Sequence, residues 1–152
     1  MTKAKEKTSP AKVLVVDDNP QNLELLVAYL EEVDCKVSSA CEGPEALEMI
    51  KSDAPDIILL DVMMPKMSGF EVCRRLKNDP ATADIPVIMV TALNELGDIE
   101  RAIDSGTDDF LSKPVNKWEL VTRVRTMLKL KNLTDKLERT LAYLSEMENQ
   151  EK

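Results

Sequence analysis

The stretch P-D-I-I-L-L-D-V-M-M-P, residues 55–65, decides how the chain is expected to fold. Ile57–Leu60 is a run of four apolar residues, so a strand here would have both of its faces buried. Such strands are typical of parallel sheets that carry helices on both sides. Asp61 follows the run directly and is the only acid inside the most apolar strand region. This position makes Asp61 a candidate functional residue.

The same pattern extends outward in both directions along the chain. Further strands are predicted at Val13–Val16, Lys36–Ala40, Pro86–Val90 and Phe110–Leu111. Helical apolar spacing fills the intervals, with helices that begin near Pro20 and Pro44 and others around Phe70–Leu76 and Ile99–Ile103. Repeated strand–helix alternation predicts right-handed crossovers and a parallel sheet. We therefore expect a doubly wound, five-stranded α/β domain over residues ~10–130.

The last segment has a different pattern. Asn116 and Glu119 have the spacing of a capping box, and one helix from Lys117 to the end would be ~54 Å long. Apolar residues fall on heptad a and d positions at Leu130, Leu133, Leu137, Leu144 and Met147, whereas Thr140 occupies one d position and Leu141 lies beside it. The stripe favours a coiled coil or a packing partner over a solvated tail. A solvated tail is the alternative, because fewer than three heptads is short.

Composition narrows the function. The formal net charge is −8, with 12 basic and 22 acidic residues in 1–114 and 8 basic and 6 acidic residues in 115–152. This acidity argues against direct nucleic-acid binding. The absence of histidine excludes histidine-based zinc sites and histidine general bases. Cys35, Cys41 and Cys73 form no C-x-x-C pair and indicate reduced thiols and a cytoplasmic location. Residues 1–11 are expected to be a disordered polar tail rather than a signal peptide, and no stretch is expected to span a membrane.

Polar residues stand at the carboxyl ends of four predicted strands. Asp17 and Asp18 follow the first strand, Asp61 the third, Thr91 ends the fourth and Lys113 follows the fifth. Ligands of doubly wound sheets bind at this edge, so these side chains should converge. Clustered carboxylates repel one another unless a cation is present, and oxygen-only ligands favour Mg²⁺. Asp61 could then attack phosphorus, with Thr91 and Lys113 stabilising the phosphoryl oxygens.

Four stretches carry a family resemblance: V-L-V-V-D-D-N-P (13–20), P-D-I-I-L-L-D-V-M-M-P-K-M-S-G-F-E-V-C-R-R-L-K (55–77), I-P-V-I-M-V-T-A (85–92) and G-T-D-D-F-L-S-K-P (106–114). They resemble the receiver domain of bacterial two-component response regulators, which has the fold of the chemotaxis response regulator. The resemblance implies a flavodoxin-like strand order 2-1-3-4-5. It also implies a receiver domain over residues 12–130 and a helical extension, a coiled-coil candidate, over residues 131–152.

The resemblance also implies metal and phosphoacceptor roles. Asp61 would be the phosphoacceptor. Asp18 and Asp61 would ligate Mg²⁺ directly together with the backbone carbonyl of Met63, and Asp17 would act through a coordinated water. Met63 and Leu93 are apolar at positions that, in this family, influence attack by water on the phosphoryl group. These two residues predict slow self-dephosphorylation.

Further residues are implied to bind the phosphoryl group and to switch. Thr91 would bind the group once formed, and Lys113 would pair with it. Phe110 matches the switch aromatic, which turns inward when Thr91 moves, although Tyr is frequent at this position. The Lys113–Pro114 bond is cis in the family.

The implied function is that of a signalling switch rather than an enzyme. Because the chain has no histidine, the donor would be the phosphohistidine of a sensor histidine kinase or a histidine phosphotransfer protein. Phosphorylation would shift the face formed by the fourth and fifth strands and the helices after them. The terminal helix would carry the signal to an output domain, an effector or a homodimer partner, with a parallel dimer as the simpler arrangement. Residues 127–141 resemble helical linkers that precede GGDEF or HD-GYP output domains.

Three other functions share part of this sequence pattern. A flavodoxin-like carrier needs a phosphate-cradling loop after the first strand, where Asp17 and Asp18 would repel phosphate. A haloacid-dehalogenase-type phosphatase requires D-x-D after that strand, and the order here differs. A receiver-like adaptor that is never phosphorylated is the third possibility, against which the complete set of five site residues argues.

Overall fold

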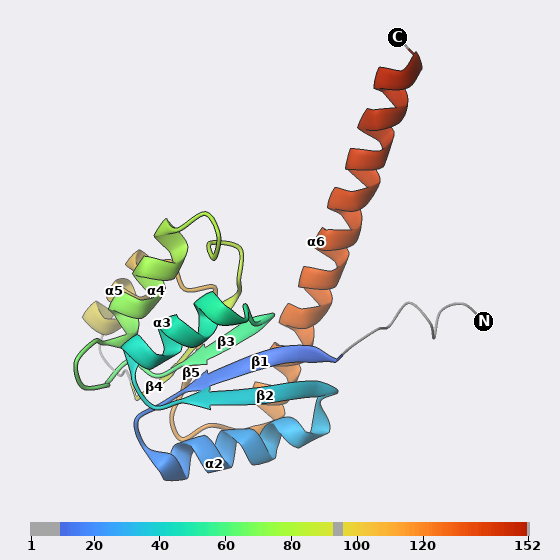
Figure 1. The fold of residues 1–152 in the computed structure, drawn as a ribbon. Coiled ribbons are helices and arrows are strands. Elements are labelled where there is room, and N and C mark those ends of the chain that lie inside the picture. Colours follow the sequence, from blue (N-terminus) through green and yellow to red (C-terminus); the bar gives the residue numbers. More distant parts are fainter. Residues whose placement is uncertain (1–9, 93–95, 152) are drawn as a thin grey trace.

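The computed structural model describes residues 10–92 and 96–151. A five-stranded parallel sheet lies at its centre, in the order β2-β1-β3-β4-β5 (Figure 1). The strands are β1 (Ala11–Val16), β2 (Cys35–Ala40), β3 (Ile57–Leu60), β4 (Val87–Thr91) and β5 (Asp109–Ser112). This topology confirms the predicted doubly wound fold and its strand order. β4 lies one residue later than predicted, because Pro86 lacks the N–H that a ladder uses.

Helices follow the strands. They are α2 (Pro20–Tyr29), α3 (Gly43–Ser52), α4 (Gly69–Asn78), α5 (Leu96–Asp104) and α6 (Lys117–Glu151). Local capping explains where two of them begin, because Asn19 accepts hydrogen bonds from the first turn of α2 and Ser68 accepts one from the first turn of α4. A short 3₁₀ turn, η1 (Leu30–Glu32), continues α2 and was not predicted.

Both faces of the sheet are covered. Ile58 and Leu60 belong to the core that packs on α3, α4 and α5, whereas Ile57 and Leu59 belong to the core that packs on α2 and α6. All four side chains of β3 are fully buried. This alternation between two cores is the physical reason for an apolar run without polar interruption.

α6 is a single helix of 35 residues, as predicted, and only its first turns belong to the domain. Leu120, Val121 and Val124 are buried against the sheet. The Asn116 side chain accepts from the Glu119 backbone N–H at 3.0 Å, which confirms Asn116 as the cap. The rest of the helix runs away from the domain (Figure 1).

In the part of the chain that the structure describes, no helix combines the length and the apolar character that crossing a membrane would require.

Candidate functional site

Three carboxylates meet where β1 and β3 end. Val16 and Leu60 are register partners, so the residues that follow them, Asp17 and Asp61, emerge side by side. The Asp61 backbone N–H donates to the Val16 carbonyl at 2.9 Å and extends this pairing. Asp17 is 1% exposed and Asp61 4%, whereas Asp18 is exposed. One carboxylate oxygen from each of the three lies within 4.8 Å of the others.

Lys113 follows β5, which is an edge strand of the sheet, and its side chain reaches the acidic cluster. Its ammonium donates to Asp17 Oδ2 at 3.1 Å and to Asp61 Oδ1 at 3.3 Å. The strand order holds it there, because β5 pairs with β4 and the Lys113 N–H donates to the Thr91 carbonyl at 2.9 Å. The Lys113–Pro114 peptide bond is cis. One partly buried lysine therefore bridges two of the three acids.

The charges in this cluster do not balance. Burial raises the pKa of Asp61 above its ordinary value, and the negative charge of Asp17 raises it further, against the opposing effect of Lys113. Burial alone would lower the pKa of Lys113, but its hydrogen bond to Asp17 and the charge of Asp61 raise that pKa overall. The site therefore holds more negative charge than its lysine neutralises, which favours a bound cation.

Thr91, at the carboxyl end of β4, has a polar group without a partner. The residue is 1% exposed, and its Oγ1 has no hydrogen-bond partner among the described residues. A buried hydroxyl left unpaired costs about 1–3 kcal/mol. The structure brings this unused hydroxyl to the same edge as Asp61, because β3 and β4 are neighbours. It is suited to donate a hydrogen bond to an anion that arrives there.

The remaining predicted residues lie around this centre. Phe110, in β5, is half-buried and packs against the core under α3, α4 and α5. Met63 has a side chain that is 73% exposed, so its chemistry toward the site would come from its backbone. Leu93 lies outside the described residues. The roles of Met63, Phe110 and Leu93 stay predictions.

A glycine at the start of α4 was missed by sequence reasoning. A Cβ added to Gly69 would lie 2.2 Å from the Asp61 carbonyl oxygen, and the Gly69 N–H donates to the Val62 carbonyl at 2.9 Å. The first turn of α4 therefore rests on the backbone of the phosphoacceptor candidate. The sequence offers only the S-G pair, in which Ser68 caps α4 and Gly69 is its first residue; the contact that excludes a side chain at Gly69 is visible only in the structure.

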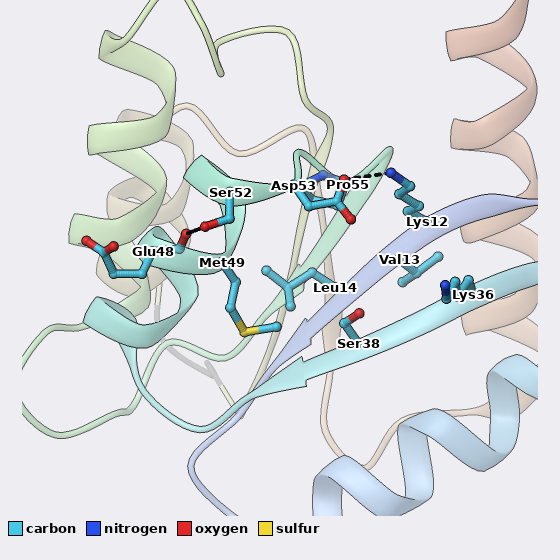
Figure 2. Close-up of a pocket in the computed structure, with 10 residues that line it drawn as sticks. All are labelled: Lys12, Val13, Leu14, Lys36, Ser38, Glu48, Met49, Ser52, Asp53 and Pro55. Carbon is cyan, nitrogen blue, oxygen red and sulfur yellow. Dashed lines mark hydrogen bonds and ion pairs between the residues drawn. The ribbon is translucent and has the colours of Figure 1, made fainter.

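A hollow of about 380 Å³ lies at the opposite, amino half of β1 and β2. Figure 2 shows it between α3 and the sheet, with the ion pair between Lys12 and Asp53 at its rim. Leu14 and Met49 form part of its apolar wall. None of the predicted site residues that the structure describes lines this hollow, whereas Asp17, Asp61 and Lys113 meet at the carboxyl edge.

The donor set at the carboxyl edge fits Mg²⁺. Among the residues that the structure describes, the cluster consists of three carboxylates and includes no nitrogen or sulfur ligand. Hard divalent cations bind through oxygen, and Mg²⁺ uses one or two protein carboxylates beside water and phosphate. Asp17, Asp18 and Asp61 are the residues that could hold such an ion.

Comparison with known proteins identifies the class. The response regulator receiver domain profile matches residues 13–125, and the chain belongs to this family. The response regulator PleD of Caulobacter vibrioides is 50% identical over 127 residues, which cover 84% of this chain and 28% of PleD. The DNA-binding dual master transcriptional regulator RpaA of Synechocystis is 42% identical over 118 residues, 78% of this chain and 49% of RpaA. The chain thus spans less than half of either relative.

Solved structures agree in fold. The receiver domain of the Francisella response regulator 1452 has a TM-score of 0.72 at 33% identity, covering 78% of this chain and 97% of that one. The receiver domain of the sensor histidine kinase PA1611 from Pseudomonas aeruginosa has a TM-score of 0.74 at 26% identity, covering 80% and 99%. That structure is described with a magnesium ion coordinated in its active-site cleft.

Proposed function

We propose that this receiver domain is a phosphorylation switch in which Asp61 is the phosphoacceptor. The donor would be the phosphohistidine of a sensor histidine kinase or a histidine phosphotransfer protein, or a small phosphodonor. One observation carries the proposal: Asp61 is a buried carboxylate whose Oδ1 lies 3.3 Å from the Lys113 ammonium, among three acids. A site in which one lysine faces three acids is suited to a reaction that brings in both a cation and an anion.

The transfer is a displacement at phosphorus. A carboxylate oxygen of Asp61 forms the new P–O bond while the P–N bond of the donor phosphohistidine breaks, and the imidazole leaves with the bonding pair and takes up a proton. Lys113 is already paired with Asp61, so its ammonium can follow the added charge onto the phosphoryl oxygens. The unpaired hydroxyl of Thr91 supplies a further donor.

Asp17, Asp18 and Asp61 would hold Mg²⁺, together with the Met63 carbonyl. When bound, the ion would supply positive charge to the phosphoryl oxygens. The protein gathers three carboxylates, two of them buried, at the carboxyl edge of the sheet. Asp61 has two carboxylate oxygens, so it could help to hold the ion and also accept the phosphoryl group.

The signal would leave through Thr91 and Phe110. A Thr91 side chain drawn to the phosphoryl group would vacate space beside the half-buried Phe110 ring, which would then turn inward. Both residues belong to the face built from β4, α5, β5 and α6. Because α6 continues outward from that face, it is the natural route to an output domain, an effector or a second copy.

Incubation with Mg²⁺ and acetyl phosphate, followed by intact-mass measurement, tests the proposal. The unmodified chain should gain one phosphoryl group, and the Asp61→Asn chain should gain none. The matched control is Asp84→Asn, which changes an exposed aspartate outside the cluster and should leave the gain intact. Absence of any gain in the unmodified chain would favour the unphosphorylated adaptor. The apolar Met63 and Leu93 predict slow decay of the phosphorylated form, and loss within seconds would contradict that part.

A further inference from the structure

Five leucines form an exposed stripe along α6: Leu130, Leu133, Leu137, Leu141 and Leu144, each 50–58% exposed. We call this set the leucine stripe. Its spacings are 3, 4, 4 and 3, so it reads the same in both directions from its centre, Leu137. Eleven residues complete about three helical turns, which keeps Leu130 and Leu141 on the same side. A contiguous apolar stripe of this kind is unfavourable in water and marks a surface for interaction.

We propose that the leucine stripe binds the leucine stripe of a second copy, with the two helices antiparallel and Leu137 on the two-fold axis. Leu130 then lies opposite the partner's Leu144, and Leu133 opposite the partner's Leu141. Isologous pairing of this type closes after two copies. The palindromic spacing permits a parallel pair as well, so another property must decide the direction.

Charge decides it. Residues 124–134 contain three basic residues and no acid, namely Arg125, Lys129 and Lys131, whereas residues 140–150 contain Glu146 and Glu148 and no basic residue. Centring the pair on Leu137 places the basic segment against the partner's acidic segment. A parallel pair would set basic against basic and acid against acid, which is unfavourable. Lys131 faces Asp56 and Asp135 of its own chain, and Arg125 donates to the Glu32 carbonyl at 2.7 Å, so the exposed Lys129 contributes most.

The base of α6 has room for the end of the partner's helix. A hollow of about 560 Å³ runs along it, with Trp118, Thr126, Met127 and Leu130 in its lining. In the antiparallel pair the partner's Met147 lies opposite Met127, so the groove receives an apolar side chain from the partner's last turns. The contact would thus extend the leucine stripe onto the domain itself. The heptad that predicted a parallel coil leaves the polar Thr140 in its seam and omits Leu141, whereas the leucine stripe avoids both faults.

Disulfide trapping tests the direction without relying on phosphorylation. Leu130→Cys and Leu144→Cys variants are prepared in the chain of 152 residues with Cys35→Ala, Cys41→Ser and Cys73→Ala, and one variant carries a mass tag. When the two variants are mixed under mild oxidation, an antiparallel pair gives the disulfide between the two different variants. This product should exceed by at least about tenfold the disulfide between two copies of either variant. An excess of disulfides between copies of the same variant would establish the parallel pair and overturn the proposal. No disulfide, with sedimentation showing only monomer, would also overturn it.

Charge reversal gives a second, independent measurement. The Glu146→Lys/Glu148→Lys chain should raise the dimer dissociation constant about tenfold in low salt, and adding Lys129→Glu should restore part of the loss. In a parallel pair the same residues of the two copies lie side by side, so each reversal replaces repulsion between two acids with repulsion between two bases, or the reverse. Leu137→Ala should weaken the dimer at least tenfold, whereas Asn132→Ala, on the opposite side of the helix, should leave it unchanged. A reversal without effect, or one that is not restored, would contradict the antiparallel arrangement.

Discussion

The carboxyl edge of the sheet buries acidic side chains, whereas the distal half of α6 exposes apolar ones. Both differ from the usual distribution of residues in a globular protein, in opposite ways. At the carboxyl edge, Asp17 and Asp61 are buried and carry charge. Along α6, Leu133 and Leu137 are apolar and more than half exposed. Buried charge and exposed leucine are each unfavourable for an isolated chain. The comparison teaches that both regions are completed from outside, the first by ions and a phosphoryl group and the second by a protein surface.

If the carboxyl edge is rigidly built, its tightest contact should give the largest effect. Gly69→Ala places a Cβ about 2.2 Å from the Asp61 carbonyl oxygen, so the loop or α4 must move. We expect the free energy of unfolding to fall by about 3 kcal/mol or more. Urea denaturation measures it. Gly97→Ala is the control, because a Cβ there meets nothing within 4 Å and alanine favours helix. Equal effects of the two substitutions would show that the backbone around Asp61 and Gly69 can move at little cost in free energy.

The next largest effect should separate the two edges of the sheet. Lys113→Ala leaves two buried carboxylates without their bridging cation, and we expect a loss of about 2 kcal/mol in a chelator at pH 7. Lys12→Ala breaks the exposed ion pair with Asp53 at the opposite edge, and we expect a smaller loss there, because solvent screens exposed charges. Thermal and urea unfolding of both variants give the comparison. A larger effect at Lys12 would reverse our ranking of the two edges.

Removing the charge of Asp61 should stabilise the domain. Its folded pKa is raised, so the contribution of Asp61 to stability is greatest below the ordinary aspartate pKa and is lost as pH rises through the folded pKa. Asp61→Asn lacks this fall and should be more stable at pH 7 without divalent ions, by roughly 1 kcal/mol. Unfolding measured from pH 4 to pH 8, with and without Mg²⁺, tests the sign. Mg²⁺ should narrow the difference, and a less stable variant would refute the repulsive cluster.

The smallest effect should come from the leucine stripe. Leu133→Gln removes no contact with the domain core, so for dilute, monomeric protein we expect a change in unfolding free energy below about 0.5 kcal/mol. Its effect should appear only when association is measured. A large loss of stability in dilute solution would mean that the distal helix packs on its own domain.

Much of the fold follows from local sequence patterns. The apolar run of β3, the cap at Asn116 and the uninterrupted α6 were all predicted, because each depends on neighbouring residues. The convergence of Asp17, Asp61 and Lys113 was also predicted, since strand ends of a parallel sheet share an edge. The double bridge made by Lys113 was not, because it depends on distances across 52 and 96 residues of chain. η1 and the tight seat of Gly69 were missed because packing, rather than periodicity, determines them.

Trp118 has a practical consequence. It is the only tryptophan in the chain, it is 67% exposed, and it stands on the first turn of α6 beside the groove. Its indole emission therefore comes from one place, without background from other tryptophans. Water leaving that place shifts the emission to shorter wavelength. The unlabelled chain thus carries its own optical probe at the junction between the receiver domain and the extended helix.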